Sequence, residues 1–295
     1  MPSADALQPS LTRRAGMKLA FSTICASCLR ADKPATPPQI ADLTASIPPR
    51  PPDDLTGSQF AESVLYLDRQ QREGVILGQL LEGNLPHFLR RLVPIELRAE
   101  LSATIFAMPE YLAIGSDNDF LRIPMNLHTA MAVADRFGFL LPTRKIVDAI
   151  YDRSTCRFLP QPLPPGPQMT STEYYRTHNA MIDAQSKTRG FPAGALVAGH
   201  KKDVVLTNRL IQNPGRIAIY GWHRAPGMPI QPLSTVHGAA YADYSHGIRL
   251  VAGIALINGR FRSVQDILQH PALAMALSDE GAIRVDSIAS AASLL

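Results

Sequence analysis

Several features that would narrow the function are scarce or absent in this sequence. No run of about 18 uninterrupted apolar residues occurs, so we expect no membrane-spanning helix. The formal net charge is only +4 over 295 residues and the basic side chains are scattered, so the continuous basic surface that nucleic-acid binding requires is missing. Only three cysteines are present, and Cys25 and Cys28 form a Cys-x-x-Cys without the second pair that a metal site needs. These absences argue against a transmembrane protein, a nucleic-acid-binding protein and a cysteine-based metal site.

The first 31 residues differ in character from the rest of the chain. Arg13 and Arg14 are followed by a moderately apolar stretch, 19–27, and then by Cys28. A charged region, a short apolar region and small residues in this order are typical of a signal peptide. The paired arginines resemble a twin-arginine export signal. We therefore expect an exported protein of the periplasm or the outer envelope.

Cys28 gives this leader a second interpretation. It follows Ala26 and Ser27, the small residues that precede the lipid-attachment cysteine of a lipoprotein signal. Cys28 is therefore a candidate site for a lipid anchor. Two alternatives stay open, namely that residues 1–31 form a disordered leader and that translation begins at Met17.

Two proline-rich segments divide the rest of the chain, whose composition is that of an ordinary globular protein with 46% hydrophobic residues. Residues 32–57 contain three Pro-Pro pairs and predict an extended tether or wrapping segment. Residues 160–167 contain five prolines in eight positions and separate a helix-rich region, 58–159, from the region 168–295. One compact domain that includes both regions is the alternative.

Apolar spacing and capping residues predict the elements of both regions. A period of three to four residues predicts helices over 58–71, 75–81, 86–92, 126–138, 143–151, 172–186 and 264–278. Stretches rich in Val, Ile and Tyr predict strands over 195–206, 216–222 and 241–257. The expected fold class is therefore α+β, with a helical N-terminal half and a mostly antiparallel sheet with flanking helices in the C-terminal half.

Histidines concentrate between Gly199 and Arg249. Six of the eight histidines follow residue 177, and four of them fall within 47 positions of strand-and-turn sequence. Histidine, aspartate and serine side chains on strands and their turns are the groups that general acid–base catalysis uses. The candidate catalytic residues are His200, Asp203, His237, Asp243, Ser245 and His246, and the candidate substrate-binding residues are Trp222, His223, Tyr241, Tyr244 and Arg249. The structural alternative is that these histidines cap turns or fill the core.

One short motif in this stretch has a known counterpart. Ser245-His246-Gly247 is followed by Ile248-Arg249-Leu250, and His237-Gly238 lies upstream. This pattern resembles the nucleophile motif of the YkuD-type L,D-transpeptidases, in which Ser-His-Gly leads into a cysteine and then Ile-Arg-Leu. The resemblance covers at most about 60 residues and implies acyl transfer, with His237, Ser245, His246 and Arg249 as the matching positions. The nucleophilic cysteine is absent, so the thiolate route of that family is closed to this chain.

Strand alternation limits how the motif can work. If residues 241–250 alternate regularly, Ser245 and His246 point to opposite faces of the sheet and are poor partners for each other. A serine triad would then need a histidine from another strand as its base, and no Gly-x-Ser-x-Gly elbow accompanies Ser245. Asp243 and Ser245 would instead hold a polar substrate while a histidine transfers protons without a covalent step.

A metal ion would supply the chemistry in another way. His200 and Asp203, together with two later histidines, could ligate zinc and so activate a water molecule. In a regular strand, however, these two side chains point to opposite faces, and the sequence contains no His-x-His or His-Glu-x-x-His. We therefore assign no cofactor, and a divalent metal such as zinc stays an open alternative.

These observations favour an exported hydrolase or transferase that acts through its histidine and aspartate cluster. The expected substrate is a cell-envelope polymer such as peptidoglycan, or a small polar molecule. The alternative is a non-catalytic envelope or carbohydrate-binding protein, in which Trp222, Tyr241 and Tyr244 line a cleft for a sugar.

Overall fold

The computed structural model describes residues 40–98 and 101–293, and every element named below belongs to one compact unit, Pro37–Leu295. The expectations for the leader, residues 1–31 with Cys28, and for the start of the proline-rich segment lie outside the described residues. The expected α+β class is confirmed, with antiparallel sheets in the C-terminal half. None of the described helices is long and apolar enough to cross a membrane.

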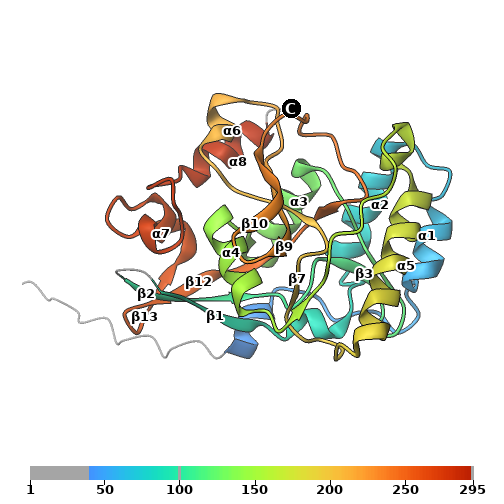
Figure 1. Cartoon of the computed structure of the whole chain (residues 1–295), viewed down its shortest axis with the longest axis horizontal. Helices are drawn as coiled ribbons and strands as arrows, with labels where there is room; N and C mark the ends of the chain where they lie inside the picture. The colour runs from blue at the N-terminus through green and yellow to red at the C-terminus, as the bar shows by residue number, and fades with distance from the viewer. Residues whose placement is uncertain (1–39, 99–100, 294–295) are drawn as a thin grey trace, which may run out of the picture. The chain divides into compact units, whose positions relative to one another are not determined.

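The helices occur in both halves of the chain (Figure 1). The α-helices are α1 (Gly57–Ser63), α2 (Arg69–Leu81), α3 (Leu127–Phe137), α4 (Arg144–Arg153), α5 (Thr172–Arg189), α6 (Arg209–Gln212), α7 (Val264–Gln269) and α8 (Val285–Ser293). Short 3-10 helices are η1 (Ile40–Thr44), η2 (His87–Arg90), η3 (Pro167–Thr170) and η4 (Ala274–Ala276).

The strands form two larger sheets and two short pairs. The strands are β1 (Val93–Arg98), β2 (Ser102–Ala107), β3 (Ala113–Gly115), β4 (Phe120–Arg122), β5 (Phe139–Leu140), β6 (Cys156–Arg157), β7 (Val197–Ala198), β8 (Lys202–Val204), β9 (Ile219–Ala225), β10 (Met228–Ser234), β11 (His246–Gly247), β12 (Val251–Ile257) and β13 (Arg260–Ser263). One sheet has the order β1-β2-β12-β13, with β5 also paired to β12, and the other has the order β10-β9-β8-β11. All pairings within these two sheets are antiparallel except that of β8 with β11.

Local capping explains why the predicted helices over 126–138 and 143–151 are close to those observed. The Asn126 side chain accepts a hydrogen bond from the backbone of Thr129 at the start of α3, and Thr143 caps α4 in the same way. Gly138 ends α3 with a positive φ of 73°, which glycine adopts without steric cost.

Three expectations about the elements were wrong. The helix over 58–71 is broken after Ser63, because Asp68 caps a new helix, α2, with a capping box. The helix over 264–278 ends at Gln269, just before Pro271, which cannot continue a helix. The strands β1 to β4 lie in the helix-rich region 58–159, for which the sequence predicted no strands.

The strands of that half are held by tertiary pairing. Ile105 of β2 pairs with Ala255 of β12, so the larger sheet takes strands from both sides of the proline-rich segment 160–167. One core of buried apolar residues also extends from Ile47 to Ile288. The regions 58–159 and 168–295 therefore share the main core, and burial of this apolar surface is the main stabilising contribution to the fold.

The second half of the predicted tether is packed against the fold. Ile47 is buried, and the Arg50 guanidinium donates hydrogen bonds to the Asn84 side chain and to the carbonyl oxygen of Gly115. Arg90 donates in turn to the carbonyl oxygen of Pro48. This part of the segment wraps around the core.

Candidate functional site

The stretch with the histidines folds back on itself through the pairing of β8 with β11. His246 lies opposite Lys202 and Gly247 opposite Asp203, and the Lys202 backbone donates a 2.7 Å hydrogen bond to the Ser245 carbonyl oxygen. Gly247 allows this approach, because a Cβ at that position would lie 2.7 Å from the Tyr111 ring. The pairing brings the two ends of the Gly199–Arg249 stretch together.

Asp243 is the centre of one polar cluster, which we call the Asp243 site and which consists of His237, Tyr241, Asp243, Ser245 and His246. One carboxylate oxygen of Asp243 accepts hydrogen bonds from the Ser245 backbone, at 2.8 Å, and hydroxyl, at 2.5 Å. Its other oxygen accepts one from the Tyr241 hydroxyl at 3.2 Å. Burial raises the pKa of Asp243, but the charges of His246 and Lys202 and the hydrogen bonds from Ser245 outweigh burial and hold it below its ordinary value.

His246 is the member of this site with no hydrogen bond. Its side chain is fully buried, neither ring nitrogen has a hydrogen-bond partner, and Nε2 lies 3.9 Å from the second carboxylate oxygen of Asp243. Burial lowers the pKa of His246 to about 4, although the charge of Asp243 opposes this shift. The imidazole is therefore neutral at pH 7, with one nitrogen free to accept a proton.

The regular strand expected over 241–257 is wrong in its first part. Residues 241–243 have no regular secondary structure and Tyr244 and Ser245 form a turn, which the backbone of His246 closes by donating to the Asp243 carbonyl oxygen. The Asp243 side chain captures the Ser245 backbone in the way that aspartate commonly does in turns, and this competes with a strand ladder. The prediction that side chains alternate between two faces of a strand therefore fails here. The Asp243 carboxylate lies close to the side chains of both Ser245 and His246.

Half-buried side chains lie at the outer limit of the Asp243 site. The His237 ring stacks on the Tyr241 ring at 4.3 Å between centroids, and the His246 ring is 6.4 Å from that of His237. Lys202 is also half-buried, and its ammonium lies 5.2 Å from the centroid of the Trp222 ring. Trp222 has a φ of 55°, a left-handed conformation that costs about 1–3 kcal/mol outside glycine.

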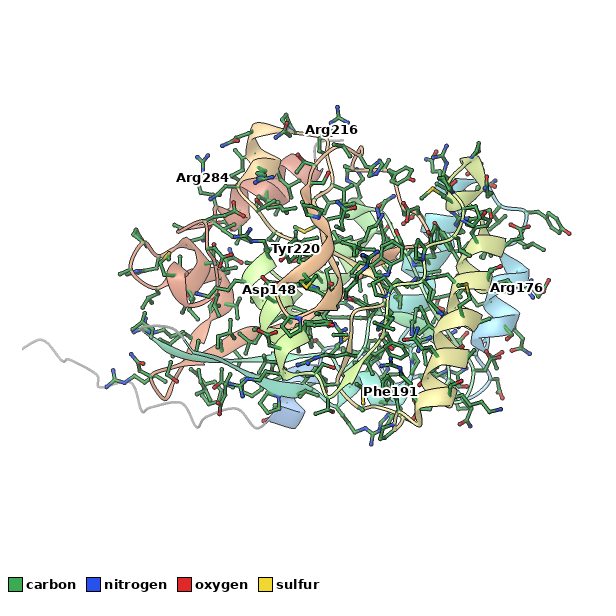
Figure 2. The ribbon with its side chains drawn as sticks, in the orientation of Figure 1. Asp148, Arg176, Phe191, Arg216, Tyr220 and Arg284 are labelled. Carbon is green, nitrogen blue, oxygen red and sulfur yellow. The ribbon has the colours of Figure 1, made fainter. Side chains whose placement is uncertain are left out.

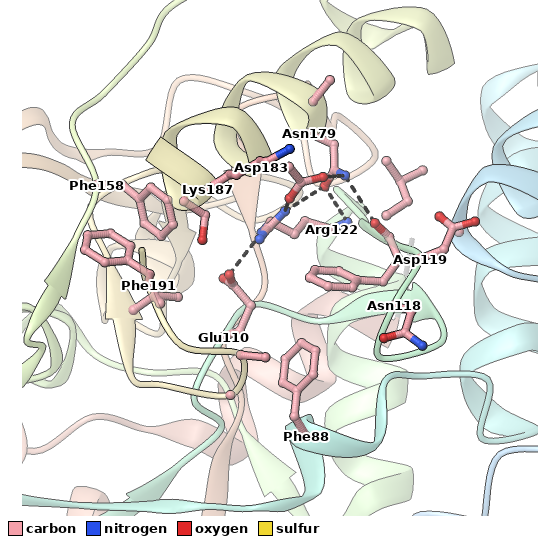
Figure 3. Close-up of a pocket in the computed structure, with 18 of the residues that line it drawn as sticks. Phe88, Glu110, Asn118, Asp119, Arg122, Phe158, Asn179, Asp183, Lys187 and Phe191 are labelled. Carbon is pink, nitrogen blue, oxygen red and sulfur yellow. Dashed lines mark hydrogen bonds and ion pairs between the residues drawn. The ribbon is translucent and has the colours of Figure 1, made fainter. Parts of the chain in front are cut away.

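His200 belongs to a different cluster, which we call the Glu110 network and which consists of Glu110, Arg122, Asp183 and His200. One Glu110 oxygen lies 2.8 Å from His200 Nε2 and accepts a hydrogen bond from the Tyr111 backbone. The other accepts one from Arg122 Nε at 3.0 Å, and Arg122 also binds Asp183 at 2.7 Å (Figure 3). The Glu110 carboxylate is thus occupied on both oxygens.

Charges within the Glu110 network fix its ionisation. Burial would raise the pKa of Glu110, but His200 and Arg122 hold it well below its ordinary value. Burial lowers the pKa of His200 to about 4, against the opposing charge of Glu110. The carboxylate is therefore ionised and paired, which is the arrangement of a structural ion pair.

Asp203 and Arg249 lie beside this network and not at the Asp243 site. Asp203 accepts a 2.8 Å hydrogen bond from the Tyr111 hydroxyl, and burial raises its pKa to about 6. The Arg249 guanidinium donates to the carbonyl oxygens of Met108 and Val197 and lies over the Tyr111 ring. Both side chains are buried and hydrogen-bonded to other parts of the fold. Their surroundings therefore do not support the prediction that they contact the substrate.

Two further predicted binding residues are also held inside the fold. His223 is buried, with Nε2 2.9 Å from an Asp148 carboxylate oxygen, to which the Tyr220 hydroxyl donates as well. Asp148 and Tyr220 are labelled in Figure 2. The Tyr244 hydroxyl is bonded to the backbone of Leu163, and its side chain is buried. Of the three aromatic residues expected to line a sugar cleft, only Tyr241 is more than slightly exposed.

Sequence reasoning missed Glu110 and the burial of Lys201. Lys201 is buried, donates a 2.6 Å hydrogen bond to the Tyr244 carbonyl oxygen, and has a pKa that burial lowers to about 7. Two adjacent lysines on a strand are typical of an exposed sheet edge, so the sequence gave no sign that the Lys201 side chain is buried. Glu110 is 90 positions from His200, and only the fold brings them together.

Among residues 40–98 and 101–293, no group of three or more His, Cys, Asp or Glu side chains converges as a metal site. His200 and Asp203, the two nearest in sequence, bind Glu110 and Tyr111 respectively. Comparisons with protein-family models, curated proteins and solved structures find no match to this chain. The function is therefore inferred from the chemistry of the side chains.

Proposed function

We propose that this protein is an exported hydrolase or transferase that acts on a cell-envelope polymer such as peptidoglycan, with the Asp243 site as its catalytic centre. His246 accepts a proton, Asp243 stabilises the imidazolium that forms, and His237 at the outer limit of the site is the second proton-transfer group. Export and the envelope substrate rest on the leader and on the resemblance of residues 245–250 to the L,D-transpeptidase motif.

The observation that carries this proposal is the unbonded imidazole of His246. A buried polar group without a hydrogen bond costs about 1–3 kcal/mol of stability, and such groups are uncommon in folded proteins. The ring nitrogens of His178 are also unbonded, but that ring packs against Trp222 and Tyr244, whereas His246 lies beside a carboxylate. Here the free imidazole lies 3.9 Å from a carboxylate that is itself held by Ser245 and Tyr241. A neutral base beside an ionised, positioned carboxylate is the arrangement used for general base catalysis.

The chemistry that fits this site uses water and not a serine nucleophile. The Ser245 hydroxyl is fully buried and donates to Asp243, so it is not activated by a histidine. In the reaction we propose, water attacks the substrate carbonyl while His246 takes its proton, and the bond to the leaving group breaks as a protonated His237 gives that group a proton. The proton on His246 then returns to His237, which restores the starting state. In transfer, a substrate amine or hydroxyl takes the place of the water.

The test is the release of fragments from purified peptidoglycan by the full chain, measured by liquid chromatography and mass spectrometry. We expect the wild-type protein to release fragments and His246→Gln to slow the release by about 10²- to 10⁴-fold, the usual contribution of a general base. The matched control is His223→Gln, which alters another buried histidine beside a carboxylate but lies outside the Asp243 site.

The proposal fails if the wild-type protein releases nothing. It also fails if His246→Gln is as active as the wild type, or if His223→Gln loses as much activity as His246→Gln at the same thermal stability.

A further inference from the structure

A lysine ammonium without an anionic partner lies beside the Asp243 site. Lys202 of β8 is paired with His246 of β11, and residues paired across neighbouring strands carry their side chains on the same face of the sheet. The side chain of Lys202 is half-buried and makes no hydrogen bond or ion pair with any residue that the structure describes. The three hydrogen-bond donors of this ammonium are therefore free to bind a ligand.

The Trp222 ring positions the Lys202 ammonium. Nζ lies 5.2 Å from the ring centroid, within the range of a cation–π contact. The ring is buried, and its Nε1 also has no hydrogen-bond partner among the described residues. A cation–π contact attracts the ammonium to the ring but supplies no negative charge to pair with it. Trp222 thus holds the charge of Lys202 in place and leaves it unpaired.

Asp243 acts on Lys202 without pairing with it. Burial lowers the pKa of Lys202, and the charge of Asp243 opposes this shift. The carboxylate oxygens of Asp243 accept their hydrogen bonds from Ser245 and Tyr241, and no ion pair joins Asp243 to Lys202. The ammonium is therefore close enough to the site to affect its charges but has donors to spare.

A second cation lies on the outer side of the same site. Arg216 is exposed and forms a β-bridge with Gly238, which follows His237 in the chain (Figure 2). Burial lowers the pKa of His237, and the charges of Lys202 and Arg216 lower it further against the charge of Asp243. Lys202 and Arg216 therefore both contribute positive potential at His237.

Arg69 adds a third positive charge. It is the exposed first residue of α2. Burial and Asp243 raise the pKa of Tyr241, and the charge of Arg69 opposes them. Lys202, Arg69 and Arg216 come from three separate parts of the chain and act on a site that contains one carboxylate. Their combined field attracts an anion to the outer side of the Asp243 site.

We propose that Lys202 binds a carboxylate, and that the substrate of the Asp243 site carries this group close to the bond that is attacked. One unpaired ammonium matches the single charge of a carboxylate better than the double charge of a phosphate group. The identification of the carboxylate as part of the substrate rests on the proposed function, whereas its binding at Lys202 does not.

The test is titration of the full chain with N-acetylalanine, which has one carboxylate, and with N-acetylalaninamide, which has none. Binding is followed by calorimetry and by the fluorescence of Trp222, the one tryptophan of the chain. We expect the acid to bind with a millimolar dissociation constant and to change the fluorescence. The amide is expected to bind at least tenfold more weakly, because it loses the charged hydrogen bond to Lys202.

Two variants of Lys202 and one control locate the binding. We expect Lys202→Met to bind the acid as weakly as the wild type binds the amide, and Lys202→Arg, which keeps the charge, to retain most of the affinity. Lys187→Met is the control, because it removes an exposed lysine of α5 that lies outside the Asp243 site. It is expected to bind the acid like the wild type.

The proposal is overturned if the acid and the amide bind the wild type equally, or if neither gives binding heat at tens of millimolar. It is also overturned if binding leaves the Trp222 fluorescence unchanged, if Lys202→Met binds the acid as well as the wild type, or if inorganic phosphate binds more tightly than the acid. The comparison of acid with amide uses the wild type, so it decides the matter even where Lys202→Met does not fold. Because these titrations measure binding, their failure would leave the release of fragments by the Asp243 site standing.

Discussion

His200 and His246 are both buried beside carboxylates, and they differ in what their rings bind. In the Glu110 network, His200 Nε2 is 2.8 Å from a carboxylate that also binds Arg122. In the Asp243 site, His246 Nε2 is 3.9 Å from the carboxylate and neither ring nitrogen has a hydrogen bond. A similar pair of residue types thus has two uses. The first arrangement is that of a structural ion pair, whereas the second leaves the imidazole unbonded, as the proposed function requires.

The largest effect that this comparison predicts is on the Glu110 network. Glu110→Ala leaves Arg122 and His200 buried without their common partner, and breaking a buried ion pair in this way costs about 3–5 kcal/mol. We expect the free energy of unfolding, measured by urea denaturation, to fall by that amount. A loss below about 1 kcal/mol would mean that the network is not what stabilises this part of the fold.

The dependence of stability on pH sharpens the comparison. Since the pKa of His200 and of His246 is lowered to about 4 in the folded state, the unfolded chain binds more protons between about pH 4 and 6.5. The contribution of His200 and His246 to the free energy of unfolding is complete above about pH 6.5 and is lost as the pH falls towards 4. Asp203 opposes this, because its raised pKa of about 6 favours the folded state at low pH.

Denaturation at pH values from 4.5 to 7 measures these contributions. Each histidine contributes one proton, or about 1.4 kcal/mol per pH unit in the steepest part of the range. We expect His246→Leu to reduce the slope of stability against pH by about one proton. An unchanged slope in that variant would show that His246 is not held neutral by burial.

The local parts of the fold could be predicted from the sequence. The helices α3 and α4 have regular apolar spacing and side-chain caps at Asn126 and Thr143, so neighbouring residues determine where they begin. The strand β2 carries no comparable local signal. It pairs with β12, roughly 150 positions away, and such pairing depends on tertiary packing and not on propensity.

The candidate site was predictable to a similar degree. Tyr241, Asp243 and Ser245 lie close together in the sequence, and the concentration of histidines pointed to them. Their geometry was not predictable, because the Asp243 side chain forms a turn where alternation suggested a strand. His200 belongs to a different cluster from His246 because it binds Glu110, which is 90 positions away in the sequence. This long-range contact could not be predicted from the residues around His200.

The most direct test of the account is the free energy of unfolding of His246→Leu, with His200→Leu as its matched comparison. Because a buried imidazole without a hydrogen bond costs about 1–3 kcal/mol, we predict that His246→Leu leaves the stability at pH 7 unchanged or raises it by up to that amount. His200→Leu removes a hydrogen bond to a charged carboxylate and is predicted to cost about 1.5–3 kcal/mol. If His246→Leu instead lost as much stability as His200→Leu, His246 would be a structural residue, and the assignment of a free base at the Asp243 site would be contradicted.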